Sequence, residues 1–119
     1  MYTAEAVHRD PVTPDLGRGP ASIQQLHTLY GAAFPDQQFT VEDLVAEDDK
    51  AVVRWTVRGT HQGELMGIAP TGKQVTVTGI TIYRLTDGKI AEEIANWDAF
   101  GLMQQFGAIP LTMNAGSGS

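Results

Sequence analysis

Asn96 and Asp98 stand at the end of an alternating segment, where a carboxylate and an amide could orient a ligand and the carboxylate could have a chemical role. Alternate residues of an extended strand share a face, so Asn96 and Asp98 lie in line with Ile94. Burial raises the pKa of a carboxyl group toward values suited to proton transfer. The pattern suits a cavity wall that is apolar at Ile94 and polar at Asn96 and Asp98, where a ligand must be oriented.

Asp98 has a second interpretation as a helix N-cap. The segment after it, "AFGLMQQ", can form a short helix, and an N-cap aspartate accepts hydrogen bonds from the unpaired N–H groups of the first turn. The two roles are compatible, so both stay open at this point.

Other polar and aromatic residues also fall where a pocket could use them. Trp55 and His61 share a face if the strand between them has no bulge, and Thr81 lies on one face of a later strand. His8 belongs to "HRDP". Each has a structural alternative: core packing for Trp55, a hydrogen-bonded loop position for His61, and a turn with Asp10 for His8.

The elements that must position these residues follow from the period of the apolar pattern. Apolar residues recur every three or four positions over 21–34, between Pro20 and Pro35, which predicts an amphipathic helix. From Phe39 the period is two. The sequence predicts two hairpins, with strands over 39–46, 51–60, 75–85 and 89–98. The segment after Asp98 is a short helix or a closing turn, and 8–20 reads as an irregular loop.

A helix followed by hairpin strands predicts an α+β fold in which the helix packs on one curved antiparallel sheet. The chain has 119 residues, enough for one domain, which we place at 1–109. Residues 110–119 are expected to be a flexible tail whose "GSGS" end resembles a linker or tag. Gly79, in mid-strand, is where the sheet bends most easily.

Composition excludes several classes of function. The net charge is -6 and the eight Lys and Arg residues are scattered, which argues against a nucleic-acid partner. The absence of cysteine excludes disulfides and thiolate chemistry. No apolar stretch has the ~20 residues of a membrane helix and the N-terminus does not read as a signal peptide, so we expect a cytoplasmic protein without membrane contact.

The segment from Arg54 to Gly107 carries "RWTVRGTH", "PTGK", "YRL" before "DGKI", and "NWD". With these motifs it resembles the SnoaL-like polyketide cyclase or ester cyclase family of the NTF2-like superfamily. The resemblance extends back to "HRDP" and so covers most of the chain.

The resemblance implies a cone of helices and curved sheet around an apolar pocket, commonly in a homodimer, that binds a small hydrophobic molecule. It implies an intramolecular aldol-type cyclisation without metal or cofactor, with Asp98 of "NWD" as the acid/base. The residues that shape the pocket are then expected to be His8, Trp55, His61, Thr81, Ile94 and Asn96.

The chain departs from the family pattern at three places. Arg9 replaces a histidine of the common His-His-Asp-Pro motif, and Glu93 and Ile94 stand where relatives often have His-Trp. Relatives usually begin with a long helix and a second short one, whereas "MYTAEAVHRD" corresponds to the end of that second helix. We therefore expect the first helix to be missing and apolar surface to be exposed in its place.

Two alternatives to a cyclase remain. A non-catalytic ligand-binding or dimerisation module would leave Asp98 with a structural role only. An epoxide hydrolase or isomerase on the same fold would need further polar partners for Asp98.

Overall fold

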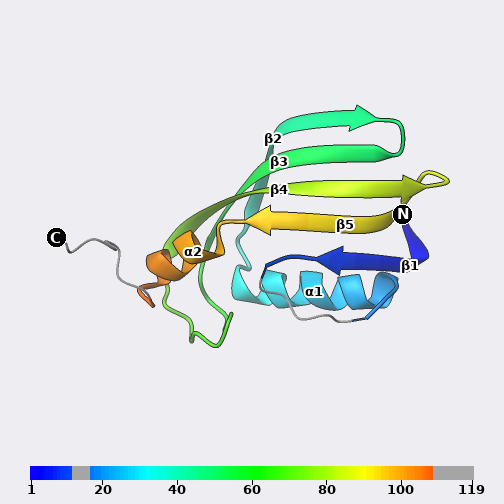
Figure 1. The fold of residues 1–119 in the computed structure, drawn as a ribbon. Coiled ribbons are helices and arrows are strands. Elements are labelled where there is room, and N and C mark those ends of the chain that lie inside the picture. Colours follow the sequence, from blue (N-terminus) through cyan, green and yellow to red (C-terminus); the bar gives the residue numbers. More distant parts are fainter. Residues whose placement is uncertain (12–16, 109–119) are drawn as a thin grey trace.

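Five strands and two helices make up the computed structural model, which describes residues 1–11 and 17–108 (Figure 1). The strands form a single sheet in the order β1-β5-β4-β3-β2. The elements are β1 (Tyr2–Arg9), α1 (Pro20–Ala33), β2 (Gln38–Glu47), β3 (Lys50–Thr60), β4 (Gln74–Thr86), β5 (Lys89–Trp97) and α2 (Ala99–Phe106). The α+β class, the helix at 20–33 and the two hairpins are therefore confirmed. The tail predicted at 110–119 lies outside the described residues.

Tight polar turns set the register of both hairpins. Thr86 pairs with Lys89 across Asp87 and Gly88, and both turn residues have positive φ, at 52° and 77°. Such conformations match the right-handed twist of the flanking strands, and they suit Asp and Gly. Asp48 likewise has a φ of 54°, in the turn between β2 and β3. The "DG" signal thus specified its hairpin correctly.

The first strand, β1, was not expected. We expect the chain to start near the end of a helix and to continue as an irregular loop over 8–20, and both expectations are wrong for Tyr2–Arg9, which is a strand parallel to β5. Its register is irregular between Tyr2 and Val7, and Ala6 is its one fully buried residue. The sheet is therefore mixed, and its parallel edge places His8 directly beside Glu93.

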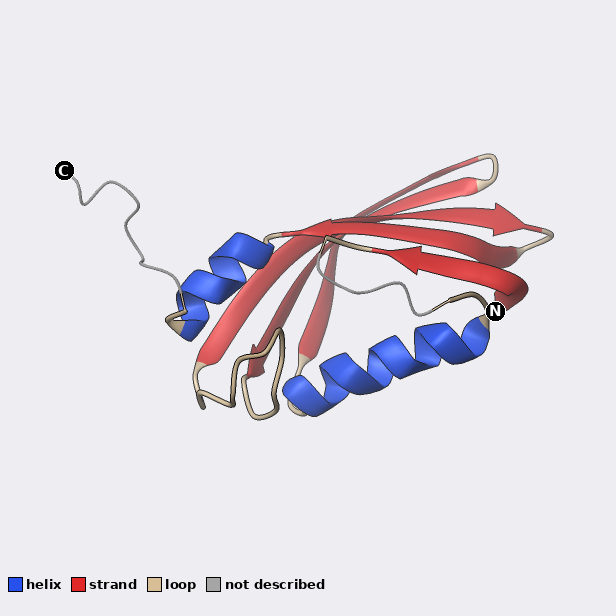
Figure 2. Ribbon diagram, turned by 60° about the horizontal axis from the view of Figure 1, so that its bottom comes forward, coloured by secondary structure: helices blue, strands red, loops and turns tan. Residues whose placement is uncertain are grey.

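A glycine and a proline mark the start of helix α1. Gly19, at a φ of 99°, is the N-cap and Pro20 is the first helical residue, where a missing N–H costs nothing. The buried side chains of α1 include Ile23 and Leu26. The helix lies beside β1 and runs along it (Figure 1), and Figure 2 shows it on one side of the sheet.

Helix α2 is short, and both of its ends are capped. The Asp98 carboxylate accepts a hydrogen bond of 2.8 Å from the Gly101 N–H, and Gly107 closes the helix with a φ of 84°. Leu102 and Phe106 are buried in the core cluster against β4 and α1. The N-cap interpretation of Asp98 is confirmed.

The edge strand β2 is solvent-exposed along its whole length. Its register shifts between Val41 and Asp43, which is a bulge in the pairing with β3. Phe39 and Val41 pair with cavity-lining residues of β3 and, like Leu44, are more than half exposed. Apolar side chains are therefore exposed on the concave side of β2.

No helix in the described part of the chain is both long and apolar enough to span a membrane.

Candidate active site

The concave face of the sheet and α1 enclose a cavity of about 480 Å³. Its wall is mostly apolar, with ionisable side chains gathered where β1 meets β5. The apolar and aromatic wall includes Leu26, Tyr30, Phe34, Phe39, Trp55, Val57, Leu65, Val77, Trp97 and Leu102. A mostly apolar cavity with a few convergent polar groups is the usual form of a small-molecule site.

The face of β5 that lines the cavity is the opposite of the predicted one. Glu93, Ala95 and Trp97 line it, while Asn96 is exposed and pairs with the exposed Ile80 on the convex face. The placement of Ile94 and Asn96 in the cavity wall is wrong. The error has a physical cause, because convex isoleucines on β4 and β5 make that face look like the interior.

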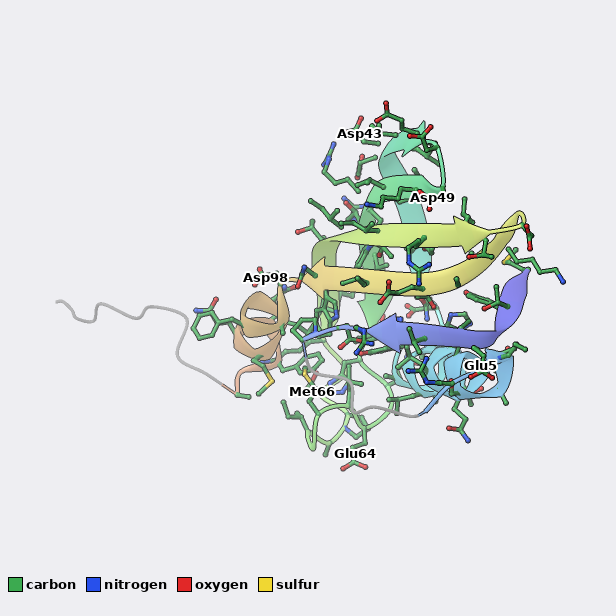
Figure 3. All side chains as sticks on the ribbon, turned by 45° about the vertical axis from the view of Figure 1, so that its right-hand side comes forward. Glu5, Asp43, Asp49, Glu64, Met66 and Asp98 are labelled. Carbon is green, nitrogen blue, oxygen red and sulfur yellow. The ribbon has the colours of Figure 1, made fainter. Side chains whose placement is uncertain are left out.

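Asp98 does not line the cavity. It lies at the junction of β5 and α2 (Figure 3), is exposed, and uses its carboxylate to cap the helix. A Cβ on Gly101 would collide with that carboxylate, so the Asp98 side chain packs directly against the first turn of α2. The acid/base role expected of Asp98 stays a prediction, and the geometry gives this carboxylate a structural task.

The ionisable cluster of the cavity consists of His8, Asp10 and Glu93. His8 Nε2 lies 2.7 Å from Asp10 Oδ2, and His8 Nδ1 lies 3.4 Å from Glu93 Oε1. The Asp10 side chain is 1% exposed and Glu93 is 5% exposed. Neither His8 Nδ1 nor Glu93 Oε1 has a hydrogen-bond partner of good geometry among the described residues. Two buried carboxylates thus flank one imidazole.

Burial alone would lower the pKa of His8, but the hydrogen bond to Asp10 and the nearby carboxylates of Glu93 and Asp10 outweigh it and raise the pKa to about 9. At neutral pH the imidazole is therefore a cation held between two acidic groups. Such a site pairs a group that can give up a proton with one that can accept it.

Two phenols share this polar end. Burial, followed by the charges of Glu93 and Tyr83 and a hydrogen bond to Glu93, raises the pKa of Tyr2 to about 12. Burial and the charge of Glu93 also raise the pKa of Tyr83, which lines the cavity opposite Glu93 on β4. Both phenols stay protonated over the physiological pH range and can donate hydrogen bonds.

Trp55 and Thr81 line the cavity as predicted. The indole N–H of Trp55 donates a hydrogen bond of 2.9 Å to Thr81 Oγ1. Phe39, which also lines the cavity, stacks on Trp55 with ring centroids 5.7 Å apart. The hydrogen bond and the stacking together fix the orientation of the Trp55 indole in the cavity wall.

His61 is not part of the cavity wall, although it is completely buried. Its ring stacks on Phe106 with centroids 3.9 Å apart, and its Nδ1 accepts a hydrogen bond of 3.2 Å from the Thr71 N–H. The imidazole is thus in its Nε2–H tautomer and anchors the loop between β3 and β4. This is the hydrogen-bonded loop position that was the structural alternative for His61.

Of the predicted site residues, the structure brings His8, Trp55 and Thr81 together in one cavity and leaves Ile94, Asn96, Asp98 and His61 outside its wall. The residues that the sequence did not assign are Asp10 and Glu93. The "HRDP" motif carried the signal for Asp10, whereas Glu93 required the correct face of β5. Within residues 1–11 and 17–108, no three acidic or histidine side chains are grouped so that they could hold a metal ion.

The fold and the cavity define a class of protein. The family model described as SnoaL-like polyketide cyclase matches residues 1–106, so the chain belongs to that family. Its architecture is the NTF2-like fold, which matching solved structures share and one of them describes as ketosteroid isomerase-like.

Individual relatives carry more specific descriptions. The nogalonic acid methyl ester cyclase of Streptomyces nogalater is 28% identical over 110 residues, which cover 87% of this chain and 81% of that protein. AclR from Streptomyces galilaeus, described as a candidate hydroxylase, is 33% identical with a TM-score of 0.76, over 92% of this chain and 71% of AclR. IdmH from Streptomyces antibioticus, described as a candidate polyketide cyclase, is 30% identical with a TM-score of 0.74, over 90% and 82%.

Proposed function

We propose that this chain is a cyclase-type enzyme that acts on a small hydrophobic carbonyl compound by acid/base catalysis without a cofactor. The observation that carries the proposal is the Glu93 carboxylate, which is buried in the cavity wall 3.4 Å from the cationic His8. The mostly apolar wall suits a polyketide-type substrate, and the family membership supports a cyclisation.

The reaction that this pair supports is an intramolecular aldol addition. The Glu93 carboxylate removes a proton from a carbon next to a carbonyl group, and the C–H electron pair delocalises onto the carbonyl oxygen as an enolate. The enolate carbon then attacks a second carbonyl of the same molecule and forms a C–C bond. The new alkoxide takes up a proton from the Glu93 carboxylic acid, which restores the carboxylate.

His8 and Asp10 assist the formation of the enolate. The His8 imidazolium stabilises negative charge as it develops on the substrate oxygen. Asp10 holds His8 Nε2 at 2.7 Å, which leaves Nδ1 directed at Glu93. Asp10 is therefore a positioning residue, whereas His8 and Glu93 face the substrate.

The base can be tested separately from cyclisation. 2-Tetralone is an apolar ketone whose C1 hydrogens exchange with D2O, and NMR follows that exchange directly. We expect the protein to accelerate it and Glu93→Gln to reduce the acceleration by about 100-fold or more, as for loss of a general base. The matched control is Glu92→Gln, since Glu92 is the neighbouring carboxylate and pairs with Arg84 and Arg9 instead.

Asp98→Asn decides between the two carboxylates, because asparagine is also a good N-cap and preserves α2. Full exchange activity in Asp98→Asn together with loss in Glu93→Gln supports the proposal. The reverse result would refute it and restore Asp98 as the base. Turnover of nogalonic acid methyl ester, the compound named for the Streptomyces nogalater relative, then tests the cyclisation. Binding of these compounds without exchange or turnover would favour the ligand-binding module.

A further inference from the structure

The hydrogen bond between Trp55 and Thr81 fixes the direction of one hydroxyl in the cavity. An indole N–H is a donor only, so Thr81 Oγ1 is the acceptor of the 2.9 Å bond. The hydroxyl hydrogen of Thr81 must then point elsewhere. No described residue accepts it, although Thr81 is only 5% exposed and lines the cavity.

A buried hydroxyl hydrogen without an acceptor is costly unless something in the cavity accepts it. The acceptor it suits is a carbonyl or enolate oxygen of a bound molecule. The indole meanwhile occupies one lone-pair direction of the oxygen, which restricts the rotation of the hydroxyl group. Thr81 is thus oriented before a ligand arrives.

Gly79 makes this arrangement possible. It is the cross-strand partner of Trp55, and a Cβ there would lie 2.7 Å from Trp55 Cη2 and 2.8 Å from Trp97 Cβ. Both distances are far below van der Waals contact, so any side chain at 79 would displace the indole. The absence of a side chain lets the indole lie across β4 toward Thr81.

The position of Thr81 relative to Glu93 suits the proposed reaction. On neighbouring strands, Thr81 pairs with Ala95 and Tyr83 pairs with Glu93. Thr81 and Glu93 are therefore diagonal neighbours on the cavity face, offset by two residues along the strands. Alternate residues of a strand are roughly 7 Å apart. A carbonyl oxygen at Thr81 would therefore leave the adjacent carbon within reach of the Glu93 carboxylate.

We propose that the Thr81 hydroxyl is the donor that binds the substrate carbonyl oxygen, oriented by Trp55 through the space left by Gly79. This inference rests on the proposed function, since it identifies which part of the same cavity recognises the ketone. Trp55 and Gly79 act through Thr81 and are positioning residues.

The test compares two ligands of nearly equal shape. 2-Tetralone has a carbonyl group, and 2-methylidenetetralin has =CH2 in its place, so the ratio of their dissociation constants by calorimetry isolates the hydrogen bond. We expect the protein to prefer the ketone by about 5-fold, which corresponds to one net hydrogen bond. Thr81→Val should abolish the preference, Thr81→Ser should keep it, and Trp55→Phe should reduce it because the hydroxyl loses its orientation.

Thr78→Val is the matched control, because Thr78 is an exposed threonine of β4 outside the cavity wall, and it should keep the preference. A full ketone preference in Thr81→Val would overturn the inference while leaving Glu93-dependent exchange intact. Loss of the preference in Thr81→Val without any exchange by the unmodified protein would overturn the proposed reaction but support the Thr81 donor. Failure of both ligands to bind would overturn both proposals.

Discussion

Glu93 and Tyr83 face each other across β5 and β4 on the cavity side of the sheet. Their proximity couples the two side chains, because ionisation of the phenol would place a second negative charge beside a buried carboxylate. Burial is the larger cause of the raised pKa of Tyr83, and the charge of Glu93 adds to it. The phenol consequently remains a hydrogen-bond donor in the cavity.

Removing the charge of Glu93 should lower the pKa of Tyr83. In Glu93→Gln the burial contribution remains, so the pKa falls but stays above its ordinary value of 10.0. Ultraviolet absorbance of phenolate during an alkaline titration measures this shift. Tyr83→Phe assigns the transition by removing it, and an identical titration curve in Glu93→Gln would contradict the coupling.

The His8 cluster makes stability depend on pH in a defined window. The pKa of His8 rises from 6.5 in the unfolded chain to about 9 in the fold. The folded state therefore binds the proton more tightly, and this contribution is fully present below pH 6.5 and lost as the pH rises to about 9. We expect the free energy of unfolding in urea to fall by about 1 to 2 kcal/mol across the window, since partial exposure screens the interaction.

His8→Gln should flatten that dependence. Comparison with His27→Gln, in an exposed histidine of α1 that also lines the cavity, separates the effect of the His8 cluster from that of a histidine elsewhere in the wall. A slope that persists in His8→Gln would show that another group is responsible.

The N-cap of α2 should be measurable as stability. Asp98→Ala removes the acceptor for the Gly101 N–H, and we expect a loss of about 1 kcal/mol in urea unfolding. Asp98→Asn should stay within a few tenths of a kcal/mol of the unmodified protein. Equal stability of all three proteins would mean that the cap contributes nothing.

Two glycine substitutions should have opposite effects. Gly79→Ala forces the Trp55 and Trp97 side chains to move and should destabilise the fold by about 1 to 3 kcal/mol. Gly31→Ala meets open space in the interior of α1 and should stabilise it by up to about 1 kcal/mol. Thermal unfolding of both variants compares them directly, and a neutral Gly79→Ala would show that the indole can relocate without cost.

Much of the fold was predictable because its hairpins and long helix carry local signals. The prolines beside α1 and the Asp87-Gly88 turn act within a few residues, and the structure follows them. Strand β1 has no such signal, since its partner residues in β5 lie 85 or more residues later and Ala6 is its one fully buried residue. Parallel edge pairing of this kind depends on the finished sheet.

The site was predictable only in part, because strand alternation shows which residues share a face but not which face is concave. On β5, Ile94 suggested an interior and Glu93 a surface, and the structure reverses both. Burial of the Glu93 carboxylate is tolerated because β1 places His8 beside it. That compensation comes from the segment whose strand the sequence did not reveal.

The bulged outer strand β2 also governs how the protein behaves in concentrated solution. An open strand edge invites pairing with another sheet, and exposed carboxylates such as Glu42 and Glu47 along this edge make two approaching copies repel each other. As the pH falls toward the isoelectric point of about 4.8, the edge loses its protection against aggregation together with the charge of the whole chain.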